Sequence, residues 1–528
     1  MTLRIGIDFD NTIVNYDGLF SKVAKKLELE LDSYPSKKES IKKEIFKKKN
    51  GLKIWQKLQG KVYGEFISNA KIFDGLKKFI IHSNLKNCKI FIISHKTQFG
   101  HYDEKKISLR KAALDFLNSK KILSPYVTGI KKKNIFFFTT RRKKINQIKK
   151  LKLDFFIDDL SEVLCDKNFP TKTNKILFSK FKENKKNIIN INNWFKIDEI
   201  INGNWSTKHL IKLSSILLKK KEILDFNQIH NGINSKVYKL KFQKNKKLIL
   251  KIYPIEDNFI SRRMRVENNS LKYLKNNNFT VPGIFKSCFD FNCSFHEFQP
   301  GKKNIKATKL LIDQCYNFIK KLSLLSKKTK INLFPKAKEA CLNPNAICEQ
   351  IEKKFNNLLK INNKPLNNFL LLEFSDLFKK YSKITKSKLN KEFKKDISKS
   401  NRILSPSDFG LHNTISEKNK LYFLDLEYFG WDDPIKLICD FFWHPGNNMS
   451  KKLKNRFLNK VINLFGKNYK NYKNFKNKLY VLLPLYGLRW CLIILNCFVN
   501  KNYKNKIIEK QQLKKAKKIL NQVSHYGY

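Results

Sequence analysis

Three short apolar runs in the first third of the chain, each followed at once by a polar side chain, constrain the fold more than any other feature. The runs are three to five residues long, which is typical of buried strands. They are 3–7 before Asp8, 89–93 before Ser94, and 155–157 before Asp158 and Asp159. Open α/β sheets carry their reactive groups at the carboxyl ends of the strands. We therefore expect a Rossmann-like α/β fold with a site at that edge of its sheet.

The residues after the first two runs are suited to reactions of phosphate esters. Asp8 and Asp10 are two residues apart, which suits a nucleophile that attacks phosphorus and an acid/base that protonates the leaving alcohol and then activates water. The hydroxyl of Ser94 can hold a phosphoryl oxygen. Taken alone, however, a serine at a strand end can equally be an ordinary cap.

Two further features complete this first set of candidate residues. Lys144 lies in a helical stretch, 141–152, and can neutralise both the phosphate and the nucleophile. Asp158 and Asp159 can ligate Mg²⁺ together with Asp8 and Asp10. A solvated lysine and a helix N-cap are the alternatives for these residues, and the sequence does not say which of the two adjacent aspartates is the direct ligand.

Strand, Ser, Lys, strand and Asp-Asp, in this order, resemble the haloacid dehalogenase superfamily, whose four short motifs are all matched. The resemblance implies a Mg²⁺-dependent phosphatase domain over 1–203. Retention of Asp10 implies hydrolysis or phosphotransfer. The polar, helix-patterned stretch at about 16–73 is then expected to be a small helical cap that covers the site and selects the substrate.

A second set of polar residues lies in the stretch 403–433. Asp408 is followed by Asn413 and, after a predicted hairpin, by Asp425. Phosphoryl transfer from a nucleotide needs a carboxylate that accepts the proton of the attacking hydroxyl. It also needs an amide oxygen and a second carboxylate that hold Mg²⁺. The alternative is two acidic turns that merely cap secondary structure.

Residues upstream of this stretch can bind the nucleotide. Gly232 and Ser235 lie in a strand-turn-strand pattern that could fold over phosphates, although a plain hairpin fits equally well. Lys251 is embedded in an apolar strand, and Glu267 lies in the helical stretch that follows. A strand lysine that is positioned by a helix glutamate is suited to pairing with the nucleotide phosphates.

The order Asp, four residues, Asn, hairpin, Asp resembles the aminoglycoside phosphotransferase and choline kinase branch of the protein-kinase-like fold. Pro406 stands where that branch usually has histidine, and this departure concerns the loop geometry. The resemblance implies an α+β bilobal kinase domain over 204–528, with a small lobe at about 204–298 and a large lobe at about 302–528. It also implies ATP and Mg²⁺ as cofactors.

The chain is strongly basic: Lys and Arg number 109 against 44 Asp and Glu, for a formal net charge of +65. Such a charge is compatible with a nucleic-acid partner. The lysines are spread evenly, however, and no RNA- or DNA-binding motif is visible. We therefore expect no specific nucleic-acid partner, and we expect the positive field to attract ATP and phosphorylated substrates.

Cysteine usage and apolar runs bear on the location of the protein. The ten cysteines show no CxxC spacing, which argues against a zinc site or a disulfide framework and fits the cytoplasm. The amino-terminus lacks a signal-peptide pattern. The apolar run at 480–499 is interrupted by Pro484, Gly487, Arg489 and Asn496, so we expect a buried helix rather than a membrane span.

Together these features predict a bifunctional phosphoryl-transfer enzyme. One site is a phosphatase that works through an aspartyl phosphate. The other is an ATP-dependent kinase of a sugar, polyol or amino alcohol, with a role in surface polysaccharide precursor synthesis as the expected pathway. The alternatives are a chain in which one domain only binds, an antibiotic-type or choline-type kinase joined to an unrelated phosphatase, and a nucleic-acid-binding protein.

Overall fold

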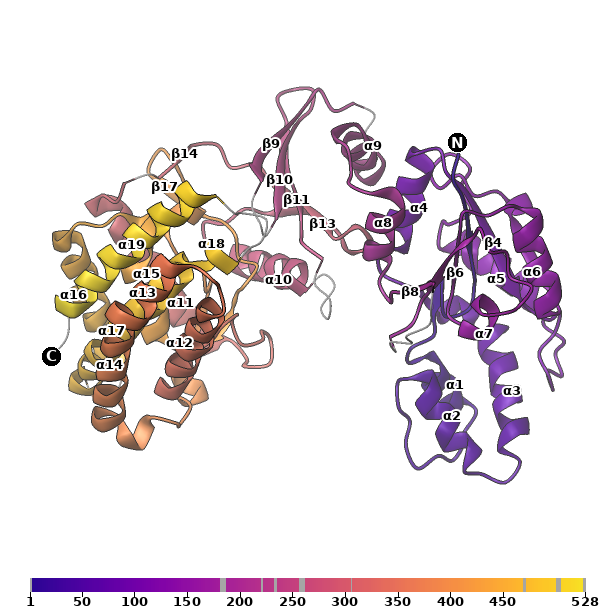
Figure 1. Cartoon of the computed structure of the whole chain (residues 1–528), viewed down its shortest axis with the longest axis horizontal. Coiled ribbons are helices and arrows are strands. Elements are labelled where there is room, and N and C mark those ends of the chain that lie inside the picture. Colours follow the sequence, from indigo (N-terminus) through magenta and orange to yellow (C-terminus); the bar gives the residue numbers. More distant parts are fainter. Residues whose placement is uncertain are drawn as a thin grey trace. The chain divides into compact units, whose positions relative to one another are not determined.

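A computed structural model describes residues 2–180, 187–219, 222–231, 235–255, 262–304, 306–468, 472–499 and 505–525 (Figure 1). The chain divides into two compact units. The first comprises Met1–Ser261 with Cys288–Cys293, and the second comprises Arg262–Ser287 with Ser294–Tyr528. The stretch from 204 to 261 thus groups with the first unit, and the domain boundary expected near Gly203 stays a prediction based on motifs.

A six-stranded parallel sheet forms the centre of the amino-terminal part, in the order β5-β4-β1-β6-β7-β8. Ile5 pairs with Ile90 on one side and with Phe155 on the other, so the strands predicted from the three apolar runs are adjacent. The strands are β1 Arg4–Ile7, β4 Lys89–His95, β5 Ile135–Phe138, β6 Phe155–Asp158, β7 Asn174–Leu177 and β8 Ile188–Asn190. The expectation of a parallel α/β sheet is confirmed.

Both faces of this sheet are covered, because its strands are apolar at successive positions. Ile90 and Ile92 pack into one core cluster, whereas Phe91 and Ile93 belong to another. Strand side chains alternate between the two faces, so a continuous apolar run needs cover on both sides. The covering helices are α4 Leu76–Leu85, α5 Leu109–Ser119, α6 Arg141–Lys150, α7 Ser161–Leu164 and α8 Trp194–Asn202.

The segment between β1 and β4 contains the expected helical insert (Figure 1). Two short antiparallel strands, β2 Val14–Asn15 and β3 Lys71–Ile72, pair where the chain enters and leaves it. Phe20 stacks on Trp55 at a centroid distance of 5.1 Å, so aromatic side chains make its small core. The helices of the insert are α1 Leu19–Lys26, α2 Lys38–Phe46 and α3 Gly51–Tyr63.

An antiparallel sheet follows helix α9 (Thr207–Leu218). Its strand order is β12-β13-β11-β10-β9. Buried side chains recur at every second position, at Tyr238 and Leu240 of β10 and at Leu248 and Leu250 of β11, which is typical of strands with two different faces. The strands are β9 Asp225–Asn231, β10 Lys236–Lys241, β11 Lys247–Ile252, β12 Ile284–Cys288 and β13 Cys293–Glu297, and helix α10 (Arg262–Asn276) lies between β11 and β12 in sequence.

The remainder of the described chain is mainly helical and carries a two-stranded and a three-stranded sheet, and β14 (Lys302–Lys303) is an outer strand of the larger one. Strand β15 (Ile403–Ser405) pairs with β18 (Gly430–Asp432), and β16 (Thr414–Glu417) forms a hairpin with β17 (Lys420–Phe423). The main helices are α11 Lys309–Lys328, α12 Pro344–Leu359, α14 Ser375–Lys388, α15 Pro434–Trp443, α16 Lys451–Asn468, α17 Tyr472–Ile494 and α19 Lys506–His525. An antiparallel sheet followed by a helical part is the element content expected of a bilobal α+β kinase fold.

Within the described residues, one helical stretch passes the length and composition test for a membrane span. It covers Asn474–Val499 and has a mean hydropathy of 1.8, but 72% of its most apolar window is buried inside the protein. Leu479, Leu483 and Leu488 of this stretch are fully buried in the core of the second unit. This packing agrees with the expectation of a core helix, since core helices meet the same criteria.

Candidate active sites

The register of the parallel sheet brings the first set of predicted residues to one edge. Ile7 of β1 pairs with Ile92 of β4 and with Ile157 of β6. The backbone N–H of Asp8 donates to the Ile157 carbonyl oxygen at 2.9 Å, so Asp8 and Asp158 lie side by side. Ser94 is buried on the neighbouring strand β4, two residues beyond Ile92.

Lys144 connects the two strand ends. Its helix α6 begins after Thr140, whose hydroxyl accepts a hydrogen bond from the Lys143 backbone N–H. The Lys144 Nζ atom lies 2.6 Å from Asp8 Oδ1 and 2.6 Å from Asp158 Oδ2. All three side chains are buried. The sequence predicted that Lys144 neutralises the nucleophile, and this contact is compatible with that role.

The carboxylates of Asp8, Asp158 and Asp159 form a negatively charged site. These three residues and Lys144 are hereafter called the Asp8 cluster. One carboxylate oxygen from each lies within 4.8 Å of the others. Burial raises the pKa of Asp8 to about 7, although the Lys144 ammonium opposes this shift. Burial also raises the pKa of Asp159 well above its usual range, and the Asp158 charge adds to that shift. Three carboxylates with converging oxygens, two of them bonded to the Lys144 ammonium, fit a bound divalent cation with oxygen ligands.

Asp10 lies outside this three-carboxylate group and has its own partners. The Tyr16 hydroxyl donates to Asp10 Oδ1 at 2.5 Å, and Lys96 Nζ lies 2.9 Å from Asp10 Oδ2. Asn11, which has a positive φ of 56°, donates from Nδ2 to Asp159 Oδ2 at 3.1 Å. The Asp10 carboxylate is not one of the three grouped carboxylates, and its expected roles as acid/base and as Mg²⁺ ligand stay predictions.

Tyr16, Lys96 and Asn11 were missed by the sequence analysis. Lys96 comes two residues after Ser94 and Asn11 directly follows Asp10, so proximity to these predicted residues was a usable signal for both. Tyr16 is the first residue of the expected insert. Its contact with Asp10 could not be read from a spacing, because the chain has to turn through β2 to make it.

The Asp408 loop, residues 406–413, connects strands β15 and β16 of the second unit. Asn413 Nδ2 donates to the Asp408 backbone carbonyl at 3.0 Å and to Asp408 Oδ2 at 3.3 Å. The Leu424 backbone N–H donates to the Asn413 carbonyl oxygen at 2.8 Å, at the base of the β16–β17 hairpin. The hairpin therefore returns the chain to Asn413 one residue before Asp425. Asp425 has a left-handed backbone, with φ 58°.

Two stacked histidines face the Asp408 carboxylate. The Nε2 atoms of His412 and His444 lie 3.4 Å and 3.7 Å from Asp408 Oδ1. Their rings are 4.0 Å apart between centroids and 6° from parallel. Burial alone would raise the pKa of Asp408, but the hydrogen bond from His412 and the two imidazoles hold it below its ordinary value. The sequence analysis did not single out His412.

The tautomer of His444 follows from its other ring nitrogen. The Gly446 backbone N–H donates to His444 Nδ1 at 2.9 Å, so the ring proton is on Nε2, which faces Asp408. Burial lowers the pKa of His444 to about 4, and His412 adds to that shift. A neutral His444 that points its N–H towards Asp408 can brace the loop in which Pro406 stands in place of the usual histidine.

Asp425 lies in a different carboxylate group from Asp408. Oxygens of Glu267, Asp425 and Glu427 lie within 4.8 Å of one another. The Leu426 backbone N–H donates to Glu267 Oε1 at 3.4 Å, and Arg263 Nη1 lies 3.3 Å from Glu427 Oε1. This group can hold a cation with oxygen ligands. It also places Glu267, expected to position a lysine, beside the expected metal ligand.

The nucleotide-binding residues predicted in the first unit are only partly described. Gly232 lies outside the described residues. Ser235 is buried at the start of β10, and Lys251 is buried on β11 with its Nζ 5.2 Å from the centre of the Tyr253 ring. Lys251 and Glu267 belong to different units, so their pairing stays a prediction.

Comparison with known proteins gives distant structural likenesses. No family model and no curated protein matches the sequence. Choline kinase from Cryptosporidium parvum Iowa II is 12% identical over 61% of this chain and 97% of its own, with a TM-score of 0.42. Choline kinase LicA from Streptococcus pneumoniae is 16% identical over 60% and 99%, with a TM-score of 0.40. Spectinomycin phosphotransferase APH(9)-Ia, in complex with ADP and spectinomycin, is 14% identical over 61% and 99%, with a TM-score of 0.44. Likenesses this weak establish neither a family nor an activity for the chain.

Proposed function

We propose that the chain is a bifunctional phosphoryl-transfer enzyme. The Asp8 cluster is a Mg²⁺-dependent phosphatase site of the haloacid dehalogenase type, and the Asp408 loop belongs to an ATP-dependent kinase of a small hydroxyl compound. The observation that carries the first half is the pair of 2.6 Å contacts from Lys144 to Asp8 and Asp158. The contact of Asn413 with Asp408, and the hairpin that leads from Asn413 to Asp425, support the second half.

At the first site, Asp8 is the nucleophile. Lys144 is bonded to Oδ1, and the other carboxylate oxygen attacks the phosphorus of a phosphate monoester. The bond from phosphorus to the ester oxygen breaks, Asp10 protonates the leaving oxygen, and an aspartyl phosphate forms. Asp10 then takes a proton from a water molecule, the water attacks phosphorus, and the bond to Asp8 breaks to release inorganic phosphate. Tyr16 and Lys96 orient Asp10 for both steps.

The same site is suited to a divalent cation. Asp8, Asp158 and Asp159 would hold Mg²⁺, because their oxygens converge and their negative charge exceeds the charge of Lys144. Bound Mg²⁺ supplies positive charge that offsets the charge of the phosphoryl oxygens. Asp10 contributes to catalysis by proton transfer, and its carboxylate is bonded to Tyr16 and Lys96.

At the second site, Asp408 accepts the proton of the hydroxyl group that attacks the terminal phosphate of ATP. His412 and His444 keep the Asp408 carboxylate ionised and fix its orientation. Asn413 and Asp425 would hold Mg²⁺, and Lys251, with Ser235 and Gly232, would contact the nucleotide phosphates. A sugar, polyol or amino alcohol is the acceptor we propose, with surface polysaccharide precursor synthesis as the pathway.

The covalent intermediate gives a direct test of the first half. The chain is mixed with a phosphate monoester and Mg²⁺, quenched, and reduced with borohydride, which converts an aspartyl phosphate into homoserine. Mass spectrometry of the peptides should find homoserine at position 8 in the wild-type chain and not in Asp8→Asn. Ester hydrolysis without any modified residue at position 8 would contradict the role of Asp8.

ADP release tests the second half. The chain is incubated with ATP and, in separate reactions, with sugars, polyols, amino alcohols and aminoglycosides. One acceptor class should raise ADP formation above the rate seen without acceptor, and Asp408→Asn should remove that increase. The same acceptor-dependent rate in Asp408→Asn would refute the proposed base.

A further inference from the structure

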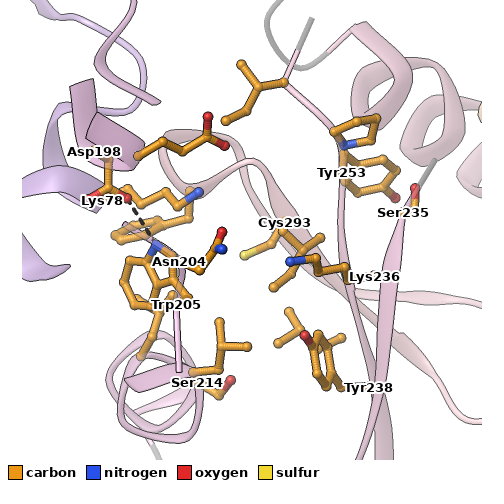
Figure 2. A pocket seen from close by; sticks show the side chains of 18 of the residues that line it. Lys78, Asp198, Asn204, Trp205, Ser214, Ser235, Lys236, Tyr238, Tyr253 and Cys293 are labelled. Carbon is orange, nitrogen blue, oxygen red and sulfur yellow. Dashed lines mark hydrogen bonds between the residues drawn. The ribbon is translucent and has the colours of Figure 1, made fainter. Parts of the chain in front are cut away.

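A cavity of about 330 Å³ lies within the first unit, and its lining includes no residue of the Asp8 cluster (Figure 2). One wall is formed by Lys78 of α4, by Asp198 and Glu199 of α8, and by Trp205. The other wall is formed by β10 and β11. Known ligand pockets start at about 300 Å³, so this volume suits a small metabolite.

The strand residues of the second wall show that Lys251 does not face this cavity, whereas Ser235, another expected nucleotide contact, lines it. Tyr238 pairs with Leu250 and Lys236 pairs with Ile252, and all four line the cavity. Lys251 lies between Leu250 and Ile252. Successive strand side chains point to opposite faces of a sheet. The cavity therefore lies on the face opposite Lys251.

Lys78 is the unusual residue of this cavity. It is only 8% exposed, and its Nζ makes no hydrogen bond or ion pair with any residue in the described part of the chain. Its ammonium group faces aromatic rings instead, 5.1 Å from the centre of Phe195 and 5.8 Å from that of Trp205. Placing a charged group in the interior is costly unless an opposite charge accompanies it.

Asp198, a carboxylate of the same wall, is hydrogen-bonded to other residues. The Asp198 carboxylate already accepts hydrogen bonds from Trp205 Nε1 at 3.0 Å and Asn202 Nδ2 at 2.8 Å, and it contacts His82 Nδ1 at 2.9 Å. Burial lowers the pKa of Lys78, the charges of Asp198 and Glu199 oppose this shift, and Lys236 adds to it. Lys78 and Lys236 point into the cavity from opposite walls (Figure 2).

We propose that this cavity binds a small hydroxylated organic phosphate, such as a sugar phosphate, whose phosphate group lies between Lys78 and Lys236. A phosphate dianion would pair with both ammonium groups through charge-assisted hydrogen bonds. The Trp205 and Tyr238 rings offer apolar surface to the carbon skeleton, and Glu199 offers an acceptor for a hydroxyl group. At this site the chain would bind a phosphorylated metabolite without using the Asp8 cluster or the Asp408 loop.

Labelling with pyridoxal 5′-phosphate tests this proposal at residue resolution. Its aldehyde forms an imine with a deprotonated lysine amine and releases water, and borohydride then reduces the imine to a stable amine. The full-length chain is labelled at a limiting reagent concentration, and the lysines are mapped by mass spectrometry. Lys78 or Lys236 should be labelled before the exposed Lys212. Ribose 5-phosphate should suppress that labelling about tenfold more effectively than ribose does.

Substitutions distinguish binding in this cavity from non-specific attraction to the charged surface. In Lys78→Met, protection of Lys236 by ribose 5-phosphate should be lost. In the matched control Lys212→Met, which removes an exposed lysine of α9 outside the cavity, protection should persist. Hydrolysis at the Asp8 cluster should be unchanged in both. If Lys78→Met does not fold, the difference in protection between ribose 5-phosphate and ribose in the wild-type chain still tests the proposal. Labelling of Lys78 and Lys236 no faster than Lys212, or equal protection by ribose, would overturn the proposal.

Discussion

Mg²⁺ binding at the Asp8 cluster should weaken about 30-fold when the pH falls from 8 to 5.5 in the absence of substrate. Burial raises the pKa of Asp8 to about 7, so its carboxyl group holds a proton below that pH when no cation is bound. A cation needs the ionised oxygen and has to displace this proton. Each pH unit below 7 then costs about tenfold in apparent affinity, and 1.5 units give about 30-fold. The raised pKa of Asp159 can make the dependence steeper.

The sign of the effect on folding follows from the same shift. Asp8 has a higher pKa in the folded chain than its ordinary value of 3.8. Its proton therefore stabilises the folded state at low pH, and this contribution is lost as the pH rises towards about 7. Without Mg²⁺, the free energy of unfolding should fall across this window. With saturating Mg²⁺, which binds the ionised form, the decline should be smaller.

Isothermal titration calorimetry can count the displaced proton. The titration uses the Asp425→Ala chain, which lacks an expected ligand of the second metal site, in two buffers of different ionisation enthalpy. About one proton should be released per Mg²⁺ at pH 6 and almost none at pH 8.5. Adding Asp8→Asn should lower the proton count at pH 6 by one. A Mg²⁺ affinity that stays constant from pH 5.5 to pH 8 without proton release would refute the reasoning.

Three substitutions test other contacts. Lys144→Met should lower ester hydrolysis by about a hundredfold or more, because each lost charge-assisted hydrogen bond is worth about 1.5–3 kcal/mol, and a rate within threefold of wild type would contradict this. His444→Phe keeps an aromatic ring but removes the N–H that faces Asp408. The pKa of Asp408 should then rise, and the acid limb of the kinase pH profile should move to higher pH. An acid limb that does not move would show that His444 does not stabilise the Asp408 carboxylate. Asp440→Asn should lower the free energy of unfolding, measured in urea, by about 3 kcal/mol, because Asp440 Oδ1 lies 2.9 Å from the buried Arg489. An unchanged midpoint of urea unfolding would show that this ion pair contributes little to stability.

The parallel sheet could be predicted because its signal is local. Runs such as 90–93 are too short for a helix and apolar at every position, which indicates a strand buried on both faces. The polar residues that follow them are brought together by the parallel register, so the convergence of Asp8 and Asp158 followed from strand direction alone. The cap of helix α15 was also predictable: Asp433 Oδ1 accepts from the Ile435 backbone N–H at 2.7 Å.

Specific contacts between side chains could not be predicted in the same way. His444 reaches Asp408 because helix α15 packs beside the loop, and neither residue carries a spacing that indicates this contact. Tyr16 reaches Asp10 through a turn of the chain. The pairing of Lys251 with Glu267 remains a prediction for a different reason, since the two residues lie in separate compact units.

The claim that one chain carries two independent phosphoryl-transfer sites is tested most directly by assaying two single variants for both reactions. Asp8→Asn should abolish hydrolysis of a phosphate monoester and leave acceptor-dependent ATP turnover within about twofold of wild type, within the usual scatter for distant, uncoupled sites. Asp408→Asn should do the reverse. Loss of both activities in either variant, with the chain still folded, would contradict the account.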